Sequence, residues 1–194
     1  MRYFESEYIF LAYYMGPFLY GVNKYVYENP DKFAFREDMT LYRNIQCSFL
    51  DFYFYKINLK HIICFPSITS TSTLKGKFNP IETAKKAYKK DRISPEDIYK
   101  ITIIFNYSHE ADNISPGIIV KDNLAKDGQY LSSHKNENEV ILFPFTFVRI
   151  TEIKEIKKEK NQYEIYLNII NRKSYIEYTL RDDVENRILF SKLD

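Results

Sequence analysis

The sequence predicts a single α+β domain in which N-terminal helices precede a mainly antiparallel β-sheet. Amphipathic helical patterns occupy residues 1–38, and short strand patterns dominate the second half of the chain. Helices and strands do not alternate in the βαβ order that a parallel sheet requires. A chain of 194 residues can bury one continuous core. We therefore expect one domain over residues 1–194, with a helical part (1–38) and a β-rich core (39–194).

The helical part is expected to contain two helices. Pro17 suits the first turn of the second helix, because proline is favoured there. Phe18, Val22 and Val26 recur every four residues, which places them on one face of that helix. The helix should end before Pro30, since the residue that precedes a proline is disfavoured in the helical conformation.

Composition excludes several classes of function. The chain has 28 Lys and Arg residues against 26 Asp and Glu residues, a net charge of +2, which argues against a strongly basic nucleic-acid binder. The uncharged stretch Tyr8–Val22 is shorter than the roughly 20 residues that span a bilayer, and acidic residues precede it. We therefore expect a soluble, intracellular protein without nucleic-acid binding or membrane insertion.

The cysteine and histidine residues predict neither a metal site nor a disulfide framework. The chain has two cysteines, Cys47 and Cys64, and three histidines, and they are too scattered for metal-ligand spacing. Cys64 stands in the apolar run Ile62–Phe65, so we expect it to be a buried, unreactive thiol.

Four elements are predicted in the first half of the β-rich core. Thr40–Arg43 is typical of a strand that ends near a turn at Asn44. A helical or irregular segment follows over Ser48–Tyr55. Ile62–Phe65 then predicts a buried strand, and a helix is expected over Pro80–Lys90.

The second half predicts strands joined by turns, and a hairpin closes the series. The expected strands are Ile101–Tyr107, Gly117–Val120, Val140–Ile150, Tyr163–Ile170 and Tyr175–Leu180. The last two are separated by a polar segment that is typical of a hairpin turn.

A hydroxyl-rich run, Ser67–Thr73, follows the strand Ile62–Phe65. Runs of this kind are normally solvated linkers or turns. On an extended chain, however, Ser70 and Ser72 would lie on one side and Thr71 on the other. Ser70 and Ser72 could then hydrogen-bond a ribose and orient a carboxylate.

Three charged residues are candidates for chemistry. Glu137 and Glu139 stand two residues apart, so on an extended chain they would project from the same side. In a cleft their repulsion would raise the pKa of one, a pairing that can stabilise a cationic sugar and activate a nucleophile. The alternative is a solvated polar turn. Arg43 either pairs with a surface carboxylate or binds a phosphate.

Together, the order of these motifs resembles the Arg–Ser–Glu class of mono-ADP-ribosyltransferases. An arginine on a first strand, an apolar strand leading into Ser-Thr-Ser, and a Glu-x-Glu pair at the start of a later strand occur within residues 40–150. The resemblance implies the fold of that family, a mainly antiparallel, split β-sheet that encloses an NAD cleft. No glycine-rich dinucleotide fingerprint is needed for such a cleft, and the chain has only five glycines.

The resemblance also implies which residues bind NAD. Arg43 would hold its diphosphate, and Ser70, Thr71 and Ser72 would support the nicotinamide-ribose pocket. Asn44 stands where the family frequently has a glycine close to the nicotinamide, and asparagine tolerates unusual backbone angles better than most residues.

For the glutamates, the resemblance implies two separate roles. Glu139 would be the catalytic carboxylate, oriented by Ser70. Glu137 would activate the acceptor, and a glutamate at this position favours arginine as that acceptor. The activity implied is transfer of ADP-ribose from NAD to a protein arginine with release of nicotinamide, without a metal. An NAD glycohydrolase and an inactive module of the same fold, binding NAD or a protein, remain alternatives.

Overall fold

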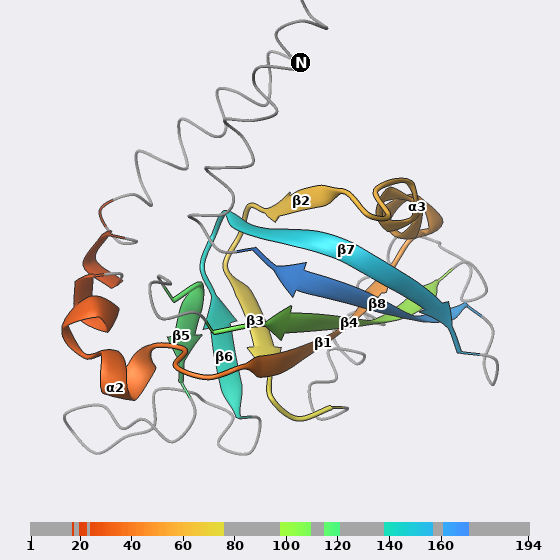
Figure 1. Ribbon diagram of the computed structural model, residues 1–194. Coiled ribbons are helices and arrows are strands. Elements are labelled where there is room, and N and C mark those ends of the chain that lie inside the picture. Colours follow the sequence, from red (N-terminus) through yellow and green to blue (C-terminus); the bar gives the residue numbers. More distant parts are fainter. Residues whose placement is uncertain are drawn as a thin grey trace, which may run out of the picture.

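In a computed structural model of the chain, an open, mixed β-sheet with few helices forms the centre of the molecule (Figure 1). The structure describes residues 17, 20–22, 24–75, 98–109, 115–120, 138–156 and 161–170. The predicted α+β class is confirmed. The predicted helix Pro80–Lys90 and strand Tyr175–Leu180 lie outside the described residues, and the extent of the domain, residues 1–194, stays a prediction.

The described elements follow the order helix, strand, helix and then seven strands, preceded by helical residues at 24–28. The helices are α2 (Pro30–Phe33) and α3 (Phe49–Ile57), and the strands are β1 (Met39–Cys47), β2 (Ile62–Phe65), β3 (Thr69–Ser72), β4 (Tyr99–Tyr107), β5 (Gly117–Ile119), β6 (Glu139–Leu142), β7 (Thr146–Glu155) and β8 (Gln162–Ile169). No helix among the described residues is both long enough and apolar enough to cross a membrane.

The strands of the described residues lie in the order β2-β7-β8-β4-β1-β3-β6-β5. Within this described sheet, neighbouring strands are antiparallel except β4 and β8, which are parallel. β1 pairs with β4 over its whole length, but with β3 only at Tyr42 and Ser72. Beyond this narrow junction, β5 and β6 run across the direction of β4 and β8 (Figure 1). The sheet therefore has two parts, and β1 and β3 meet where they join.

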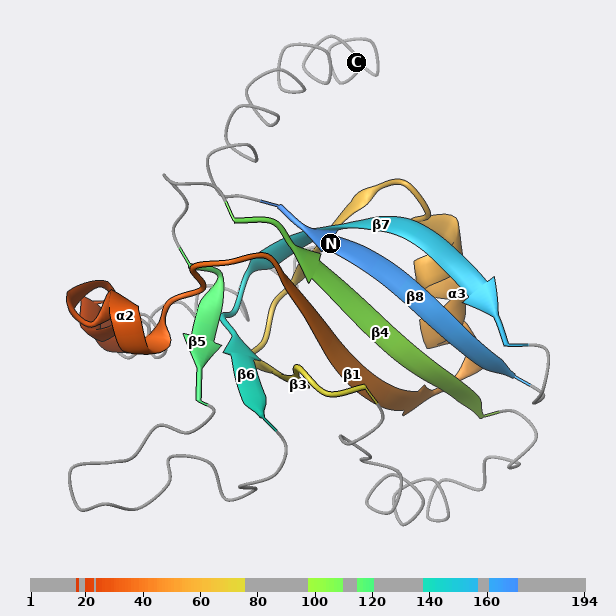
Figure 2. The same ribbon diagram turned by 60° about the horizontal axis from the view of Figure 1, so that its bottom comes forward.

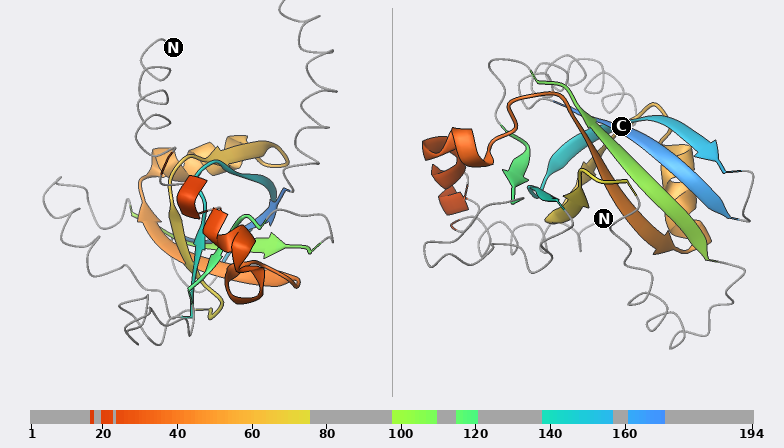
Figure 3. Two further views of the ribbon diagram at one scale, coloured as in Figure 1. Left: turned by 90° about the vertical axis from the view of Figure 1, so that its left-hand side faces the viewer. Right: turned by 90° about the horizontal axis from the view of Figure 1, so that it is seen from below.

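The core lies on the face of β1, β4 and β8 that carries their alternate apolar side chains. Leu41, Ile103, Phe105, Ile165 and Leu167 are almost completely buried there. Figure 3 shows β1, β4 and β8 side by side, with α3 against one face of them. The alternation of buried and exposed positions is what a sheet covered on one face requires.

Helix α3 forms because its N-terminus is capped and its inward face is aromatic. The Ser48 hydroxyl accepts a hydrogen bond from the backbone N–H of Asp51, and the Asp51 carboxylate accepts one from the N–H of Ser48, which makes a capping box. Inward, the Phe52 ring packs on Tyr99 and Tyr163 with ring centroids 4.8 and 4.2 Å apart. α3 is thus held against the strands that carry the core (Figure 2).

Two predictions about the first half of the core are wrong. Asn44 does not end the first strand, because β1 continues to Cys47 and stays paired with β4 throughout. Arg43 consequently lies in the middle of a strand. Cys64 is exposed, since β2 is an edge strand whose inward side is occupied by Ile63.

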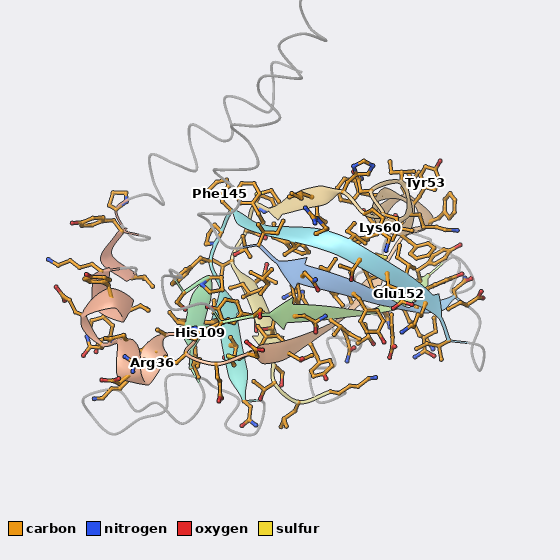
Figure 4. All side chains as sticks on the ribbon, in the orientation of Figure 1. Arg36, Tyr53, Lys60, His109, Phe145 and Glu152 are labelled. Carbon is orange, nitrogen blue, oxygen red and sulfur yellow. The ribbon has the colours of Figure 1, made fainter. Side chains whose placement is uncertain are left out.

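The predicted strand Val140–Ile150 is two strands, β6 and β7. Phe145 lies between them with a φ of 61°, in the left-handed region, and its N–H donates to the carbonyl of Phe65 at 2.7 Å (Figure 4). A non-glycine residue in this region costs about 1–2 kcal/mol. The break lets β6 pair with β3 and β5 while β7 pairs with β2 and β8.

Gly117 is where β5 approaches β6 too closely for a side chain. A Cβ atom at this position would meet the carbonyl group of Ile141 and lie 3.0 Å from the Cα of Leu142. We expect Gly117→Ala to destabilise the protein by about 1–3 kcal/mol, because backbone atoms must shift. Gly21→Ala is the matched control, since a Cβ at Gly21 meets nothing within 4 Å. Urea unfolding of both variants measures the difference, and equal midpoints would contradict the expectation.

Candidate functional site

Three of the predicted site residues form one chain of hydrogen bonds across β1, β3 and β6. The guanidinium Nη1 of Arg43 donates to the backbone carbonyl of Ser70 at 2.7 Å. The Ser70 hydroxyl donates to Oε1 of Glu139 at 2.8 Å. Arg43 and Glu139 are 96 positions apart in the sequence (139 − 43). They are brought together with Ser70 because β1, β3 and β6 are neighbours in the sheet.

The register of β3 and β6 accounts for the contact between Ser70 and Glu139. Ser72 is paired with Glu139, and Ser70 with Ile141. Residues that are paired across an antiparallel ladder share a face, so Ser70 and Glu139 are diagonal neighbours within reach of each other. The hydroxyl-rich run is therefore a central strand at this point, and not a linker.

Thr71 has a different task from the serines on either side of it. Its side chain is fully buried on the other face of β3 and donates to the carbonyl of Val140 at 2.7 Å. The Ser72 hydroxyl accepts a hydrogen bond from the N–H of Leu74 at 2.9 Å. The predicted alternation of Ser70, Thr71 and Ser72 is thus present, with Thr71 tying β3 to β6.

Arg43 is a half-buried cation beside a backbone carbonyl and a phenol. Among the described residues, no carboxylate forms a salt bridge with it. Burial lowers the pKa of Arg43, and the nearby Tyr55 of α3 acts in the opposite direction. Burial also raises the pKa of Tyr55 to about 12, so this phenol is neutral at physiological pH. A desolvated guanidinium next to a carbonyl and a phenol is suited to receive an anion.

Tyr55 was not among the residues that the sequence singled out. It follows Phe52 by three positions, and this spacing places both on the same face of α3. That spacing was the available signal. The spacing indicates that the Tyr55 side chain points inward, but it does not indicate that Tyr55 lies near Arg43.

Glu139 is held at the first residue of β6 by backbone contacts on both sides. Its carbonyl accepts from the N–H of Val120, next to β5, at 3.0 Å. On the other side, the carbonyl of Asn138 accepts from the N–H of Thr73, next to β3, at 3.3 Å. The carboxylate is half-buried and uses one oxygen for Ser70. Its position is thus fixed by strands on either side.

Glu137 lies outside the described residues, and the backbone beside it differs from the expectation. We expected an extended chain through Glu137 and Glu139. Asn138 between them has a φ of 46°, in the left-handed region that asparagine tolerates well. The alternation rule that would put both carboxylates on one side therefore does not apply at this point.

The side chain of Asn44 accepts a hydrogen bond from β4. Its Oδ1 accepts from the hydroxyl of Thr102 on β4 at 2.8 Å. Strand alternation places Asn44 and Arg43 on opposite faces of β1. Any contact of Asn44 with a ligand beside Arg43 would therefore come from its backbone.

No group of three or more His, Cys, Asp or Glu side chains that could hold a metal ion occurs within the described part of the chain. Within the described residues, the hydrogen-bonded chain brings together the Arg43 guanidinium, the Ser70 hydroxyl and the Glu139 carboxylate. The guanidinium can bind an anionic part of a ligand, and the carboxylate can place a negative charge beside another part of the same ligand.

Comparison with solved structures finds matches that cover about three quarters of this chain. The Vis toxin, an ADP-ribosyltransferase from Vibrio splendidus, is 19% identical, and the match covers 72% of this chain and 51% of that chain with a TM-score of 0.42. The ADP-ribosyltransferase HopU1 of Pseudomonas syringae is 16% identical over 71% of this chain and 46% of that chain, with a TM-score of 0.44. An ADP-ribosyltransferase from Clostridium botulinum is 14% identical over 76% of this chain and 67% of that chain, with a TM-score of 0.47.

This chain spans about half the length of the Vis chain that it matches. No protein-family model matches the sequence, and no curated protein matches it. The three proteins from Vibrio, Pseudomonas and Clostridium are all ADP-ribosyltransferases.

Proposed function

We propose that this protein is an NAD-dependent mono-ADP-ribosyltransferase that transfers ADP-ribose to protein arginine and releases nicotinamide. The observation that carries the proposal is the hydrogen-bonded chain of Arg43, Ser70 and Glu139. The sequence resemblance assigns binding of the diphosphate to Arg43, orientation of the carboxylate to Ser70 and catalysis to Glu139.

The surroundings of Arg43 support the binding of a diphosphate. A guanidinium has five N–H donors, so the hydrogen bond to the Ser70 carbonyl leaves capacity for phosphate oxygens. A phosphate would also supply the negative charge that the Ser70 carbonyl and the neutral Tyr55 phenol do not. A diphosphate bound at this point would bring the nicotinamide ribose of NAD within reach of Glu139, since Arg43 and Glu139 both hydrogen-bond to Ser70.

The carboxylate of Glu139 supports cleavage of the bond between ribose and nicotinamide. When the bond from C1′ to the nicotinamide nitrogen breaks, the electron pair leaves with nicotinamide, which becomes neutral. Positive charge then develops on the ribose, and a fixed carboxylate stabilises it. Ser70 holds Glu139 in place for this step.

Transfer completes the reaction when a guanidinium nitrogen of the acceptor forms the new bond to C1′. The proton that this nitrogen loses goes to a carboxylate, a task that we assign to Glu137. Incubation with NAD carrying a label in its adenosine part, together with an arginine-rich protein, should give a labelled protein and free nicotinamide. Consumption of NAD without labelling would indicate a glycohydrolase, and intact NAD would contradict both activities.

Glu137→Gln tests the acceptor role separately. We expect the variant to lose transfer to arginine by about tenfold or more while it retains most NAD hydrolysis, because water does not need the same base. Labelled protein and free nicotinamide are measured in the same reaction. Glu152→Gln, at an exposed position of β7, is the control and should change neither rate (Figure 4). Equal loss of both activities in Glu137→Gln would refute its separate role.

A further inference from the structure

The chain that leaves β3 is tied to a strand on the other part of the sheet. The ammonium of Lys75 lies 2.9 Å from Oε1 of Glu164 on β8. The second carboxylate oxygen of Glu164 accepts from the hydroxyl of Tyr166 at 2.7 Å. Two strands, β4 and β1, separate β8 from β3 in the sheet. Lys75 therefore connects the end of the Ser-Thr-Ser strand to the part of the sheet that contains Arg43.

Such a connection acts where the sheet has little other pairing. β1 and β3 are paired at Tyr42 and Ser72, whereas β1 and β4 are paired from Met39 to Cys47. The contacts made by Thr71 and Thr73 join β3 to β6, which belongs to the same part of the sheet as β3. They do not fix β3 relative to β1.

We propose that Lys75, Glu164 and Tyr166 form a positioning device that fixes β3 against β1, so that Ser70 meets both Arg43 and Glu139. The inference deepens the proposed function and rests on it for its effect on catalysis. None of the three residues is assigned a contact with NAD. They act through β3.

The lowered pKa of Glu164 indicates that its ion pair with Lys75 is formed at neutral pH. The carboxylate has a relative exposure of 15%, whereas the Lys75 side chain is 58% exposed. Hydrogen bonds from Lys75 and then Tyr166 lower the pKa of Glu164, and the positive charge of Lys154 on β7 contributes in the same direction. A lowered pKa means that the ion pair is complete above the ordinary carboxylate pKa and is lost only as pH falls through the lower value. It is therefore present at neutral pH.

Lys75→Met tests the inference with two readouts, because methionine keeps the apolar stem without the charge. We expect amide hydrogen exchange in residues 69–75 to speed up by about threefold or more, while exchange in β4 and β8 stays as in the parent. We expect kcat for NAD cleavage to fall by about threefold to tenfold with KM for NAD within about twofold, because Glu139 acts in the transition state. Lys75→Arg should restore both values.

Lys24→Met is the matched control. Lys24 forms an exposed ion pair with Glu28 at 3.8 Å, outside the Lys75, Glu164 and Tyr166 contacts. The variant should leave both readouts unchanged. Parental exchange in residues 69–75 of Lys75→Met, or equal acceleration in Lys24→Met, would overturn the positioning role even if the protein does not cleave NAD. Faster exchange with parental kcat would overturn its effect on catalysis, whereas a parent without NAD cleavage would contradict the proposed function alone.

Discussion

Replacement of Glu139 by glutamine is expected to lower the rate of NAD cleavage by about 100-fold to 1,000-fold, both with and without an arginine acceptor. Glutamine has the size of glutamate and retains a carbonyl oxygen that can accept the hydrogen bond from Ser70. The variant should therefore fold normally. It loses the negative charge that stabilises the ribose cation, and that charge is needed whichever acceptor follows. The rate of NAD cleavage is measured as nicotinamide release, quantified by chromatography.

Glu152→Gln provides the comparison for Glu139→Gln, since it makes the same chemical change on an exposed part of β7. It should cleave NAD at the parental rate. A Glu139→Gln variant that retains more than about a tenth of the parental rate would place the catalytic charge on another residue.

Replacement of Arg43 by alanine is expected to weaken NAD binding by about 10-fold to 100-fold. The reason is the loss of a half-buried guanidinium that has no described carboxylate partner and lies beside the Ser70 carbonyl. Arg43→Lys should recover only part of the affinity, because lysine keeps the charge but not the planar pair of donors that fits a phosphate. Titration calorimetry with NAD measures the dissociation constant of each variant.

Arg36→Ala is the control for Arg43→Ala. Arg36 forms an exposed ion pair with Asp31 of α2, outside the strands that carry Arg43, Ser70 and Glu139 (Figure 4). We expect NAD binding to be unchanged in this variant. Equal affinities of the parent and Arg43→Ala would refute the assignment of Arg43 to the diphosphate.

The parts of the fold that the sequence predicted well are those governed by local pattern. Ile62–Phe65 is a strand with the predicted bounds, because an apolar run followed by proline has few other solutions. The Ser48–Tyr55 segment became α3, whose start is determined by the capping residues Ser48 and Asp51. The alternation of Ser70, Thr71 and Ser72 followed from extended geometry alone.

The failures are positions where a partner elsewhere in the sheet overrides the local pattern. Asn44 is typical of a turn, yet full-length pairing with β4 keeps β1 extended through it. The apolar stretch Val140–Ile150 contains Pro144, a break signal that the prediction of one strand did not use. Which strands each half pairs with depends on the strand order of the sheet. Cys64 is exposed because β2 is at an edge, a property of strand order that no local pattern contains.

The candidate site could be predicted from the sequence in its residues but not in its contacts. The sequence order of Arg43, Ser70 and Glu139 allowed their roles to be predicted by resemblance. Their contact could not be predicted from residue spacing, because it depends on β1, β3 and β6 being neighbours. The position of Tyr55 near Arg43 depends in turn on how α3 packs on the sheet.

A crystal structure of the Glu139→Gln variant with NAD tests the central claim most directly, since this variant should bind NAD without cleaving it. We predict the diphosphate at the Arg43 guanidinium, and C1′ of the nicotinamide ribose next to residue 139 and the Ser70 hydroxyl. NAD bound with its diphosphate away from Arg43, or with its nicotinamide ribose out of reach of β3 and β6, would contradict the account.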